Sequence, residues 1–465
     1  MKRFLGVFLS VLMLFSLFGC SKSNDSILTQ EAIKTIENSN SVDYGILFRN
    51  QALELMRYSD NDLGSCLAGS SADLDKANYI ETLFTDLGLS NVHKENIIVD
   101  SWVFNGLTLS FECSCKEEGL LTLRKIGAYP CEFNYNNEKF DLVYVNKGLE
   151  NDYTNIDVAG KGVLLNTSAD LKKAVKLAKE KGASFIITSQ ESEYSSTTYS
   201  YDMALNLPRD IPVFILSKSN FSLLREYSPE NNIIEVYLTG SSEIEKNVEA
   251  PFVIGEIEGK KKDKYVYVTA NRDSLEQGFM SSNLSIAELY LLAQDLKTSG
   301  FKPEYTIRFM ITTGQEFSSI SEYGYNLGLE KYLNTLSEED KNNIQSVLVI
   351  DGSKPFQGLT LTETQISNND ALKEKIVEYN EKFKEKDYRF INTINEVNEI
   401  FNTEGLVWKE KEIPVVVQAE PSISEYRSIN NSSSDNSGLL IDSTQSKFLY
   451  EYYFGIIKLM STEKY

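Results

Sequence analysis

The second half of the chain alternates apolar runs of strand length with helical patterns, and this alternation restricts the fold more than any other feature. Apolar runs lie at residues 265–270, 306–312 and 346–350. Residues 285–297, between the first two runs, have apolar side chains at the spacing of one helix face. Strands that are apolar on both faces are typical of a parallel sheet that helices cover on both sides. We therefore expect an α/β fold with a mostly parallel sheet, which residues 413–418 extend.

A smaller α/β unit precedes that region. Residues 169–181 have the pattern of an amphipathic helix, and short apolar runs at 162–166 and 184–188 flank it. Polar stretches bound the whole segment on either side. We predict that residues 115–249 form a domain of their own.

The rest of the chain is expected to fold around this insertion. A chain of 465 residues is too long for one ordinary hydrophobic core. We predict that residues 31–114 and 250–465 form one domain, interrupted by the smaller one. In the first of these segments, residues 52–86 have a helical pattern, which predicts a helix over that range.

The first twenty residues have the pattern of a lipoprotein signal peptide. Lys2 and Arg3 give a positive start, and an apolar run follows them. Leu17-Phe18-Gly19-Cys20 reads as a lipobox, in which cleavage precedes Cys20 and its thiol takes a diacylglycerol. The alternative is an ordinary secretory signal with a chance cysteine. The polar tether at residues 21–30 favours the lipoprotein, so we predict an extracytoplasmic protein anchored in the cell membrane through Cys20.

Charge and cysteine content limit the partners. The formal net charge of −21 argues against nucleic acid and anionic lipid as binding partners. With Cys20 acylated, four cysteines remain in a compartment that permits disulfides. Their pairing cannot be read from the sequence. These cysteines are Cys66, Cys113, Cys115 and Cys131.

Polar side chains follow each predicted strand of the larger domain. Asn271-Arg272-Asp273 follows the first strand, Gln315-Glu316 the second and Asp351 the third. Tyr426-Arg427-Ser428 comes shortly after the last one, beyond Glu420. Ligand sites in open α/β sheets lie at the carboxyl ends of the strands, so we expect these residues to meet there.

The order of these segments resembles peptidase family M28, the zinc aminopeptidases, in the arrangement with an inserted protease-associated (PA) domain. The resemblance extends over nearly all of the chain after the signal peptide. It implies a zinc-exopeptidase-like fold and an aminopeptidase reaction at two zinc ions. The motifs that carry it lie at residues 67–70, 77–80, 157–163, 181–187 and 306–317.

Three positions of the family's metal centre carry matching carboxylates in this chain. The resemblance implies that Asp273 is the aspartate of a His-x-Asp motif, which orients the first histidine ligand. It also implies that Glu316 and Asp351 are two of the carboxylate ligands.

The other positions of the centre are altered. Asn271 stands where the family has its first histidine ligand, and Ser282 stands at the aspartate that bridges the metals. Arg427 stands at the last histidine, and Gln315 replaces the general base. Amide and hydroxyl groups are poor zinc donors, and a guanidinium has no lone pair to donate. Glutamine cannot accept a proton from water.

No other histidine is present to take over. The chain has a single histidine, His93, which precedes a predicted strand and is expected to be a turn residue with satisfied hydrogen bonds. We therefore predict that no catalytic residue set is intact and that zinc is not a cofactor. The leading hypothesis is a lipid-anchored M28 peptidase-like protein that binds peptides or another cell-envelope partner. The alternatives are an active aminopeptidase with an altered metal site and a solute-binding lipoprotein.

Three interpretations of the remaining carboxylates stay open. In the first, they surround a water-filled pocket. In the second, Arg427 lies among them and neutralises them through forked hydrogen bonds. In the third, an all-oxygen calcium or magnesium site uses them. That set would comprise Asp273, Glu316 and Asp351, with Glu420 and Asp435 as additions.

Overall fold

The structure is a computed structural model of the chain. It describes residues 42–112, 120–192, 195–199, 201, 206–227, 233–350, 363–384, 394–397, 403–419, 429 and 432–462. The predictions on the signal peptide, Cys20, Cys113, Cys115, Asp351, Glu420 and Arg427 lie outside these residues. Within the described ranges, no helix is both long enough and apolar enough to span a bilayer.

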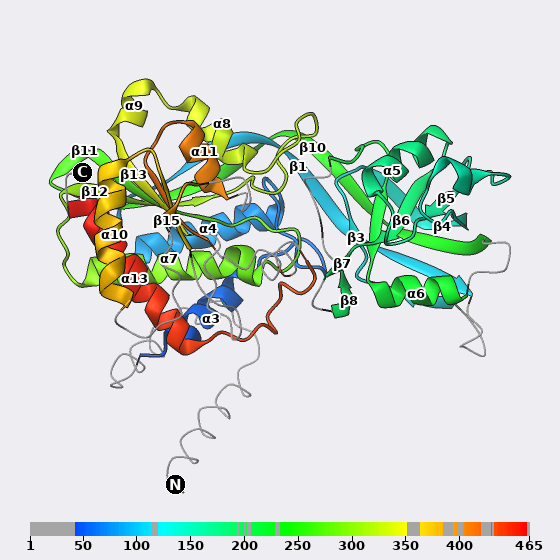
Figure 1. Ribbon diagram of the computed structural model, residues 1–465, viewed down its shortest axis with the longest axis horizontal. Helices are drawn as coiled ribbons and strands as arrows, with labels where there is room; N and C mark the ends of the chain where they lie inside the picture. The colour runs from blue at the N-terminus through cyan, green and yellow to red at the C-terminus, as the bar shows by residue number, and fades with distance from the viewer. Residues whose placement is uncertain are drawn as a thin grey trace, which may run out of the picture.

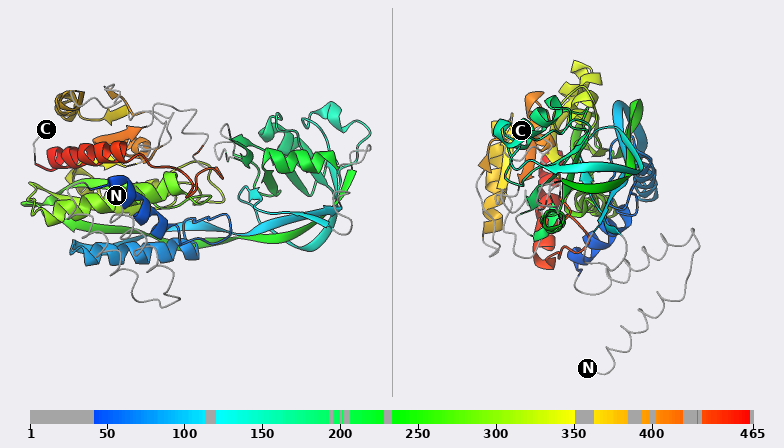
Figure 2. Two further views of the ribbon diagram at one scale, coloured as in Figure 1. Left: turned by 90° about the horizontal axis from the view of Figure 1, so that it is seen from below. Right: turned by 90° about the vertical axis from the view of Figure 1, so that its right-hand side faces the viewer.

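Two bodies of unequal size are joined by one long ribbon of two strands (Figures 1 and 2). The ribbon consists of β1 (Ser90–Glu112) and β10 (Ile233–Ile257), which pair antiparallel along most of their length. The larger body contains both termini of the described chain, and the smaller one lies at the far end of the ribbon. We call them the peptidase-like unit and the inserted unit.

The sheet of the peptidase-like unit is mostly parallel, as the apolar runs predict. Its centre is β11 (Lys261–Asn271), which pairs in parallel with β12 (Tyr305–Thr312) and β13 (Ile344–Val349). Outside β13 lies β16 (Val415–Ala419), also parallel. One edge is completed by β14 (Glu363–Ser367), which is antiparallel to β16, and by β15 (Ile394–Asn395). On the other side, β10 pairs antiparallel with β12 and leads into the ribbon.

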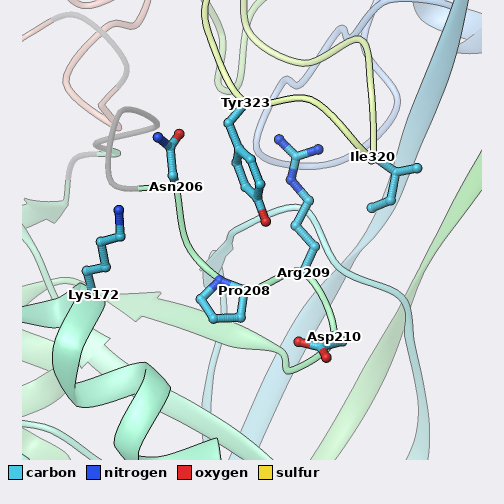
Figure 3. A pocket seen from close by; sticks show the side chains of 7 residues that line it. All are labelled: Lys172, Asn206, Pro208, Arg209, Asp210, Ile320 and Tyr323. Atoms are coloured by element: carbon cyan, nitrogen blue, oxygen red, sulfur yellow. The ribbon is translucent and has the colours of Figure 1, made fainter.

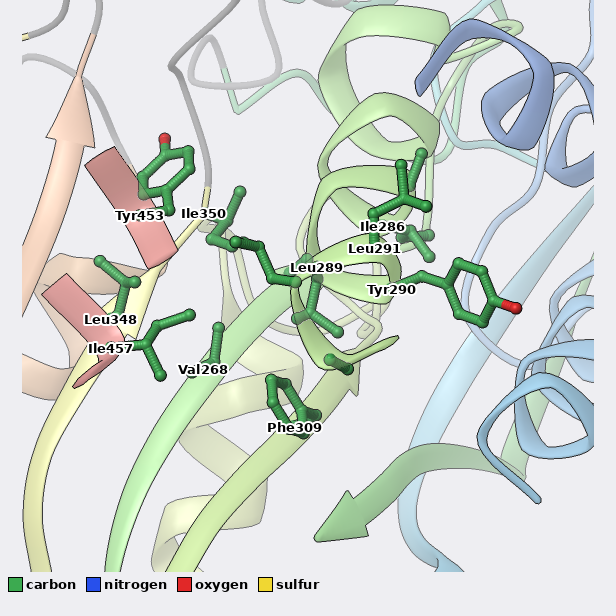
Figure 4. Packing of buried hydrophobic residues seen from close by; sticks show 14 of the residues in the cluster. Val268, Ile286, Leu289, Tyr290, Leu291, Phe309, Leu348, Ile350, Tyr453 and Ile457 are labelled. Carbon is green, nitrogen blue, oxygen red and sulfur yellow. The ribbon is translucent and has the colours of Figure 1, made fainter. Parts of the chain in front are cut away.

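Helices cover both faces of this sheet because alternate side chains of its strands point to opposite faces. Val266 and Val268 lie in a core with α7 (Leu284–Thr298), and Tyr267 lies in the core on the other face. Figure 4 shows side chains of α7 close to Val268 and Phe309 of neighbouring strands. The face with α7 is also covered by α3 (Tyr44–Leu55), α4 (Ser71–Asp86), α10 (Asp370–Lys384) and α13 (Ser443–Thr462). The face with Tyr267 is covered by α8 (Leu327–Thr335) and α11 (Glu404–Glu410). The short helix α9 (Glu338–Asn343) leads into β13.

The prediction of one helix over residues 52–86 is wrong. The structure has α3 and α4 in this region, separated by a loop. Gly69 has a φ of +77°, and a Cβ there would lie 2.6 Å from the Val248 side chain, so the loop needs glycine. Ser70 then caps α4 by accepting a hydrogen bond from the backbone N–H of Asp73.

The inserted unit has its own hydrophobic core, and its strands continue the sheet of the peptidase-like unit through β10, which pairs antiparallel with β4. Strands β4 (Phe133–Tyr144), β5 (Gly162–Leu164), β6 (Phe185–Ser189) and β9 (Val213–Leu216) run parallel. Helices α5 (Leu171–Glu180) and α6 (Lys218–Glu226) pack on these strands. The other described elements of the unit are β2 (Leu120–Leu123), β3 (Gly127–Ala128), β7 (Glu191–Ser192), β8 (Ser195–Tyr199) and the short helix η1 (Glu150–Tyr153). The predicted small α/β unit is thus present. Its assignment as a PA domain and the predicted domain boundaries stay predictions.

Candidate functional site

The turn after β11 and the loop after β12 meet at the carboxyl edge of the sheet, as expected for adjacent parallel strands. Asp273 joins the two segments. Its carboxylate accepts hydrogen bonds from the backbone N–H groups of Gln315, at 3.1 Å, and of Glu316, at 3.0 Å. Three of the predicted site residues are therefore neighbours.

Asn271 uses its side chain inside its own turn. The amide nitrogen donates to the backbone carbonyl of Asp273 at 3.0 Å, and the amide oxygen accepts from the backbone N–H of Asp273 at 3.4 Å. Only 3% of the residue is exposed. Both ends of the amide are thus engaged with the backbone two residues further along.

Ser282 lies in the π-helix η3 (Phe279–Asn283), which leads into α7. Its hydroxyl donates to the backbone carbonyl of Gly278 at 3.3 Å. The turn before η3 requires glycine at position 278, because φ is +58° and a Cβ would lie 2.4 Å from Ser274. The serine hydroxyl is consequently fully buried against this turn.

Asp435 closes the other side of η3. Its two carboxylate oxygens accept hydrogen bonds from the backbone N–H groups of Met280 and Ser281, the latter at 3.0 Å. The side chain is almost completely buried. Asp435, a candidate oxygen ligand in the sequence, therefore caps the helical segment that contains Ser282.

A buried ion pair lies directly behind the site, and the sequence analysis did not identify it. The Arg272 guanidinium forms a forked contact with Asp73 in the first turn of α4, with Nε–Oδ1 at 2.7 Å and Nη2–Oδ2 at 3.0 Å. Neither side chain is exposed to solvent. The Thr313 hydroxyl adds a hydrogen bond of 2.9 Å to Asp73. Lys76, also buried, donates to the Arg272 carbonyl at 3.3 Å.

This network fixes the position of the segments around the site. It ties α4 to the ends of β11 and β12, and Lys76 also reaches the side chain of Asn283, at 3.2 Å, at the start of α7. One signal in the sequence could have revealed it. Asp73 and Lys76 are charged residues on the helix face that also carries Ala77 and Ile80, which is the buried face.

Burial changes the protonation of the site's carboxyl groups. Desolvation raises the pKa of Asp273 to about 6, although the two backbone hydrogen bonds from Gln315 and Glu316 oppose this effect. Desolvation also raises the pKa of Glu276, which follows in the same loop, to about 8. At neutral pH, Glu276 is therefore expected to hold a proton for much of the time.

The histidine and the described cysteines lie in satisfied or closed surroundings. His93 lies within strand β1, so its prediction as a turn residue is wrong, but its ring nitrogens do have partners, the Asn91 carbonyl at 2.7 Å and the Glu95 carboxylate at 3.0 Å. Cys66 and Cys131 are buried free thiols, and burial raises the pKa of each to about 12. Neither thiol is suited to nucleophilic chemistry, because such chemistry requires the thiolate.

The inserted unit contacts the loop that follows Glu316 through Arg209. Arg209 of the inserted unit lies over the rings of Phe317, at 4.9 Å, and Tyr323, at 4.3 Å. Its guanidinium also donates to the backbone carbonyl of Ser319. Figure 3 shows Arg209 and Tyr323 in the cavity of about 710 Å³ that opens beside this contact.

A second cavity between the two units borders the turn that leads to Ser282. It has a volume of about 680 Å³. Glu276, Gln277 and Asp435 line it from the peptidase-like unit, and Arg124 and Lys125 from the inserted unit. Here Tyr199 of the inserted unit donates a hydrogen bond of 2.9 Å from its hydroxyl to the carboxyl group of Glu276 in the peptidase-like unit.

Comparisons with known proteins agree with the expected family resemblance. Residues 253–435 match the sequence profile of peptidase family M28. The fold is similar to that of BSAP, a zinc aminopeptidase from Bacillus subtilis, with a TM-score of 0.64 at 18% identity, covering 89% of this chain and 95% of that one. A comparison with curated proteins finds no match.

Two further solved structures are similar over most of their length. A peptidase M28 precursor from Shewanella amazonensis SB2B gives a TM-score of 0.66 at 16% identity, covering 96% of this chain and 98% of that one. An aminopeptidase from Aneurinibacillus sp. strain AM-1 gives 0.57 at 15% identity, with coverages of 90% and 94%. At these identities the likeness shows the fold, so the predicted fold class and the M28 resemblance are confirmed.

Proposed function

The chain has an M28 peptidase-like fold, and we propose that it binds peptides without hydrolysing them. The state of Asn271 is the observation that carries this proposal. The residue stands at the family's first histidine position, and both ends of its amide are engaged with the backbone of Asp273. An amide held in this way offers a metal no imidazole nitrogen, and its oxygen already accepts a backbone hydrogen bond.

The other described side chains at the metal positions also fit zinc poorly. Ser282 is a hydroxyl that donates to the Gly278 carbonyl, and zinc sites in proteins use thiolate, imidazole and carboxylate ligands. Among the described residues, no group of three or more His, Cys, Asp or Glu side chains is placed to hold a metal ion. Arg427, at the last histidine position, would add a positive charge.

Peptide hydrolysis also needs a base, and Gln315 cannot supply one. A glutamine side chain has the shape of glutamate but accepts no proton from water near neutral pH. Asp273 instead holds the loop after β12, through the hydrogen bonds that its oxygens accept from the backbone N–H groups of Gln315 and Glu316. Hydrolysis by the family's route therefore has no general base at its usual position in this chain.

Calcium or magnesium bound to oxygen ligands has less support than peptide binding alone. Two of the carboxylates in that hypothetical set, Asp273 and Asp435, each accept two backbone N–H hydrogen bonds. These hydrogen bonds stabilise the two carboxylates in their positions, and this stabilisation does not require a cation. The account in which Arg427 neutralises the remaining carboxylates stays a prediction, since Arg427 lies outside the described residues.

Binding in the space between the units suits the arrangement of the two cavities. Each cavity borders a loop at the carboxyl edge of the sheet, after β11 or after β12. Both cavities are lined by residues of both units. Cavities of this size at a domain boundary are typical of small-ligand sites. Peptides are the ligand class that the aminopeptidase-like fold suggests, by analogy with its relatives. With acylated Cys20 as anchor, the protein would present this space on the extracytoplasmic side of the cell membrane.

An aminopeptidase assay tests the absence of hydrolysis. Purified protein would be incubated with a panel of aminoacyl reporters, with and without added zinc, cobalt or manganese, and BSAP from Bacillus subtilis would serve as the active control. We expect no turnover above that of a heat-denatured sample. Turnover that a chelator abolishes would overturn the proposal in favour of an active aminopeptidase with an altered metal site.

A further inference from the structure

The cavity between the units that contains Glu276 has walls of opposite charge. The peptidase-like unit contributes the carboxyl groups of Asp62, Glu276 and Asp435, and the inserted unit contributes Arg124 and Lys125. Most of the remaining lining consists of hydroxyl and amide side chains, namely Tyr199, Ser217, Ser219, Asn220, Gln277, Ser433 and Asn436. A site of this kind matches a ligand that is cationic at one end and anionic at the other.

Glu276 is a buried carboxyl group in the lining of the cavity. The residue is 5% exposed, and its carboxyl group accepts a hydrogen bond from the Tyr199 hydroxyl at 2.9 Å. The Tyr201 hydroxyl also hydrogen-bonds it. Within the described part of the chain, no lysine or arginine forms an ion pair with Glu276. A buried carboxylate without an ion-pair partner is costly, so Glu276 is expected to hold a proton for much of the time, and a ligand ammonium group would stabilise its ionised form.

Arg124 and Lys125 form the cationic wall. Both residues are exposed, and neither makes an ion pair with any side chain that the structure describes. Lys125 has a φ of +53°, in the left-handed region, whereas most of the non-glycine residues with positive φ in this chain are asparagines. Lysine has no local hydrogen bond that favours this conformation, and strained residues of this kind cluster at ligand-binding sites.

The size of the cavity limits the ligand. A volume of about 680 Å³ falls in the range of small-ligand sites, roughly 300–1,000 Å³. Such a space accommodates a few amino-acid residues. The polar side chains between its charged ends can hydrogen-bond peptide groups in either direction, because amides both donate and accept.

We infer that this cavity selects short peptides with both ends free, holding the ammonium group at Glu276 and the terminal carboxylate at Arg124 and Lys125. The inference rests on the proposed function, which is peptide binding without hydrolysis. It adds a specificity to that function. The site binds the two charged termini of a peptide, and the side chains of the peptide contribute less to its affinity. An end-blocked peptide or an internal segment of a protein would leave one of the charged walls without its partner.

Native mass spectrometry of the full chain with mixtures of randomised tripeptides tests this rule. One mixture has free ends, a second is acetylated at the amino end, and a third is amidated at the carboxyl end. We expect the free mixture to bind, and each blocked mixture to bind at least roughly tenfold more weakly, because one charged contact is lost.

Variants assign each end to its wall. Glu276→Gln keeps the hydrogen bond from Tyr199 but cannot ionise beside a ligand ammonium group, so it should abolish the penalty for acetylation alone. The double variant Arg124→Gln, Lys125→Gln should abolish the penalty for amidation alone. Lys147→Gln is the matched control, because Lys147 is an exposed lysine of the inserted unit that lines neither cavity. It should leave both penalties unchanged.

The outcomes separate the inference from the function beneath it. Equal binding of all mixtures would overturn the selection of free ends and leave peptide binding intact. Penalties that persist in the cavity variants would place the site elsewhere and overturn the assignment of residues. If no mixture binds, or if bound peptides are shortened, peptide binding without hydrolysis is itself wrong.

Discussion

Arg272 and Asp73 form a forked ion pair that is completely closed to solvent, with Nε–Oδ1 at 2.7 Å and Nη2–Oδ2 at 3.0 Å. Asp73 belongs to α4, and Arg272 lies between Asn271 and Asp273 at the end of β11. The pair therefore joins a helix from the beginning of the described chain to the edge of the sheet where a metal centre would lie in family M28. Hydrogen bonds from Thr313 and Lys76 extend the pair into a network of protein side chains at this edge.

Breaking that pair should destabilise the whole protein. Arg272→Met leaves Asp73 buried with a charge and no cation, so we expect a loss of about 3–5 kcal/mol in the free energy of unfolding. Urea denaturation followed by circular dichroism measures it. The double variant Arg272→Met, Asp73→Leu should recover much of the loss, because it removes both charges.

An exposed ion pair provides the control for this experiment. Lys139 and Glu235 contact each other at 2.5 Å on the surface of the inserted unit. Lys139→Met should leave the denaturation midpoint unchanged, since exposed pairs contribute little. An equal loss in Lys139→Met and Arg272→Met would contradict the importance given to the buried pair.

The free energy of unfolding should fall as the pH rises from about 4.5 to about 8. Burial raises the pKa of Glu276 from its ordinary value of 4.5 to about 8. Between these pH values the folded state keeps a proton that the unfolded state has released, so the free energy of unfolding decreases as the pH rises through this window. Below pH 4.5 both states are protonated and Glu276 contributes no slope. At about 1.4 kcal/mol per pKa unit, the loss amounts to a few kcal/mol.

The groups that face Glu276 are the Tyr199 and Tyr201 hydroxyls, Lys125 and Asp435. None of them changes the sign of this effect. Glu276→Gln should flatten the slope between pH 6 and 8, as measured by urea denaturation at each pH. The smaller slope from Asp273, whose pKa rises from 3.8 to about 6, should remain at lower pH. An unchanged slope in Glu276→Gln would show that this carboxyl group is ionised in the folded protein.

The contact of Arg209 should control the mobility of the loop after Glu316. Arg209→Lys keeps the charge but loses the planar group that lies over Phe317 and Tyr323. We expect a loss of about 1–2 kcal/mol in local stability, seen as faster hydrogen exchange in residues 317–323. Exchange in β11 should stay the same. Uniformly faster exchange across the chain would indicate a general loss of stability instead.

Restoring the missing donors should restore metal binding. The triple variant Asn271→His, Ser282→Asp, Arg427→His would return imidazole and carboxylate groups to the positions where the family has its ligands. We expect it to retain about one zinc ion or more per chain after gel filtration, whereas Asn271→His alone should retain far less. A triple variant that holds no more zinc than the parent chain would show that these positions were assigned wrongly.

The part of the site that depends on strand order could be predicted from the sequence. Parallel strands end at the same edge, so Asp273 was expected near Gln315 and Glu316, and its carboxylate does accept their backbone N–H groups. The helix over residues 52–86 was wrong because a helical pattern does not reveal the left-handed turn at Gly69 that separates α3 from α4.

Contacts between distant segments could not be predicted in this way. Asp73 and Arg272 are 199 positions apart, and no local pattern pairs a charge on one element with a charge on another. The same holds for Tyr199 and Glu276, which meet only because β8 of the inserted unit lies beside the peptidase-like unit. The cavity between the units is therefore a property of the folded chain alone.

The metal content of the purified protein tests the central claim most directly. The protein would be dialysed against zinc, passed through a desalting column and measured by inductively coupled plasma mass spectrometry, with BSAP treated in parallel. We expect BSAP to keep its zinc and this chain to retain close to none. About two zinc ions per chain, lost on Glu316→Ala, would contradict the claim that this fold has lost its metal centre.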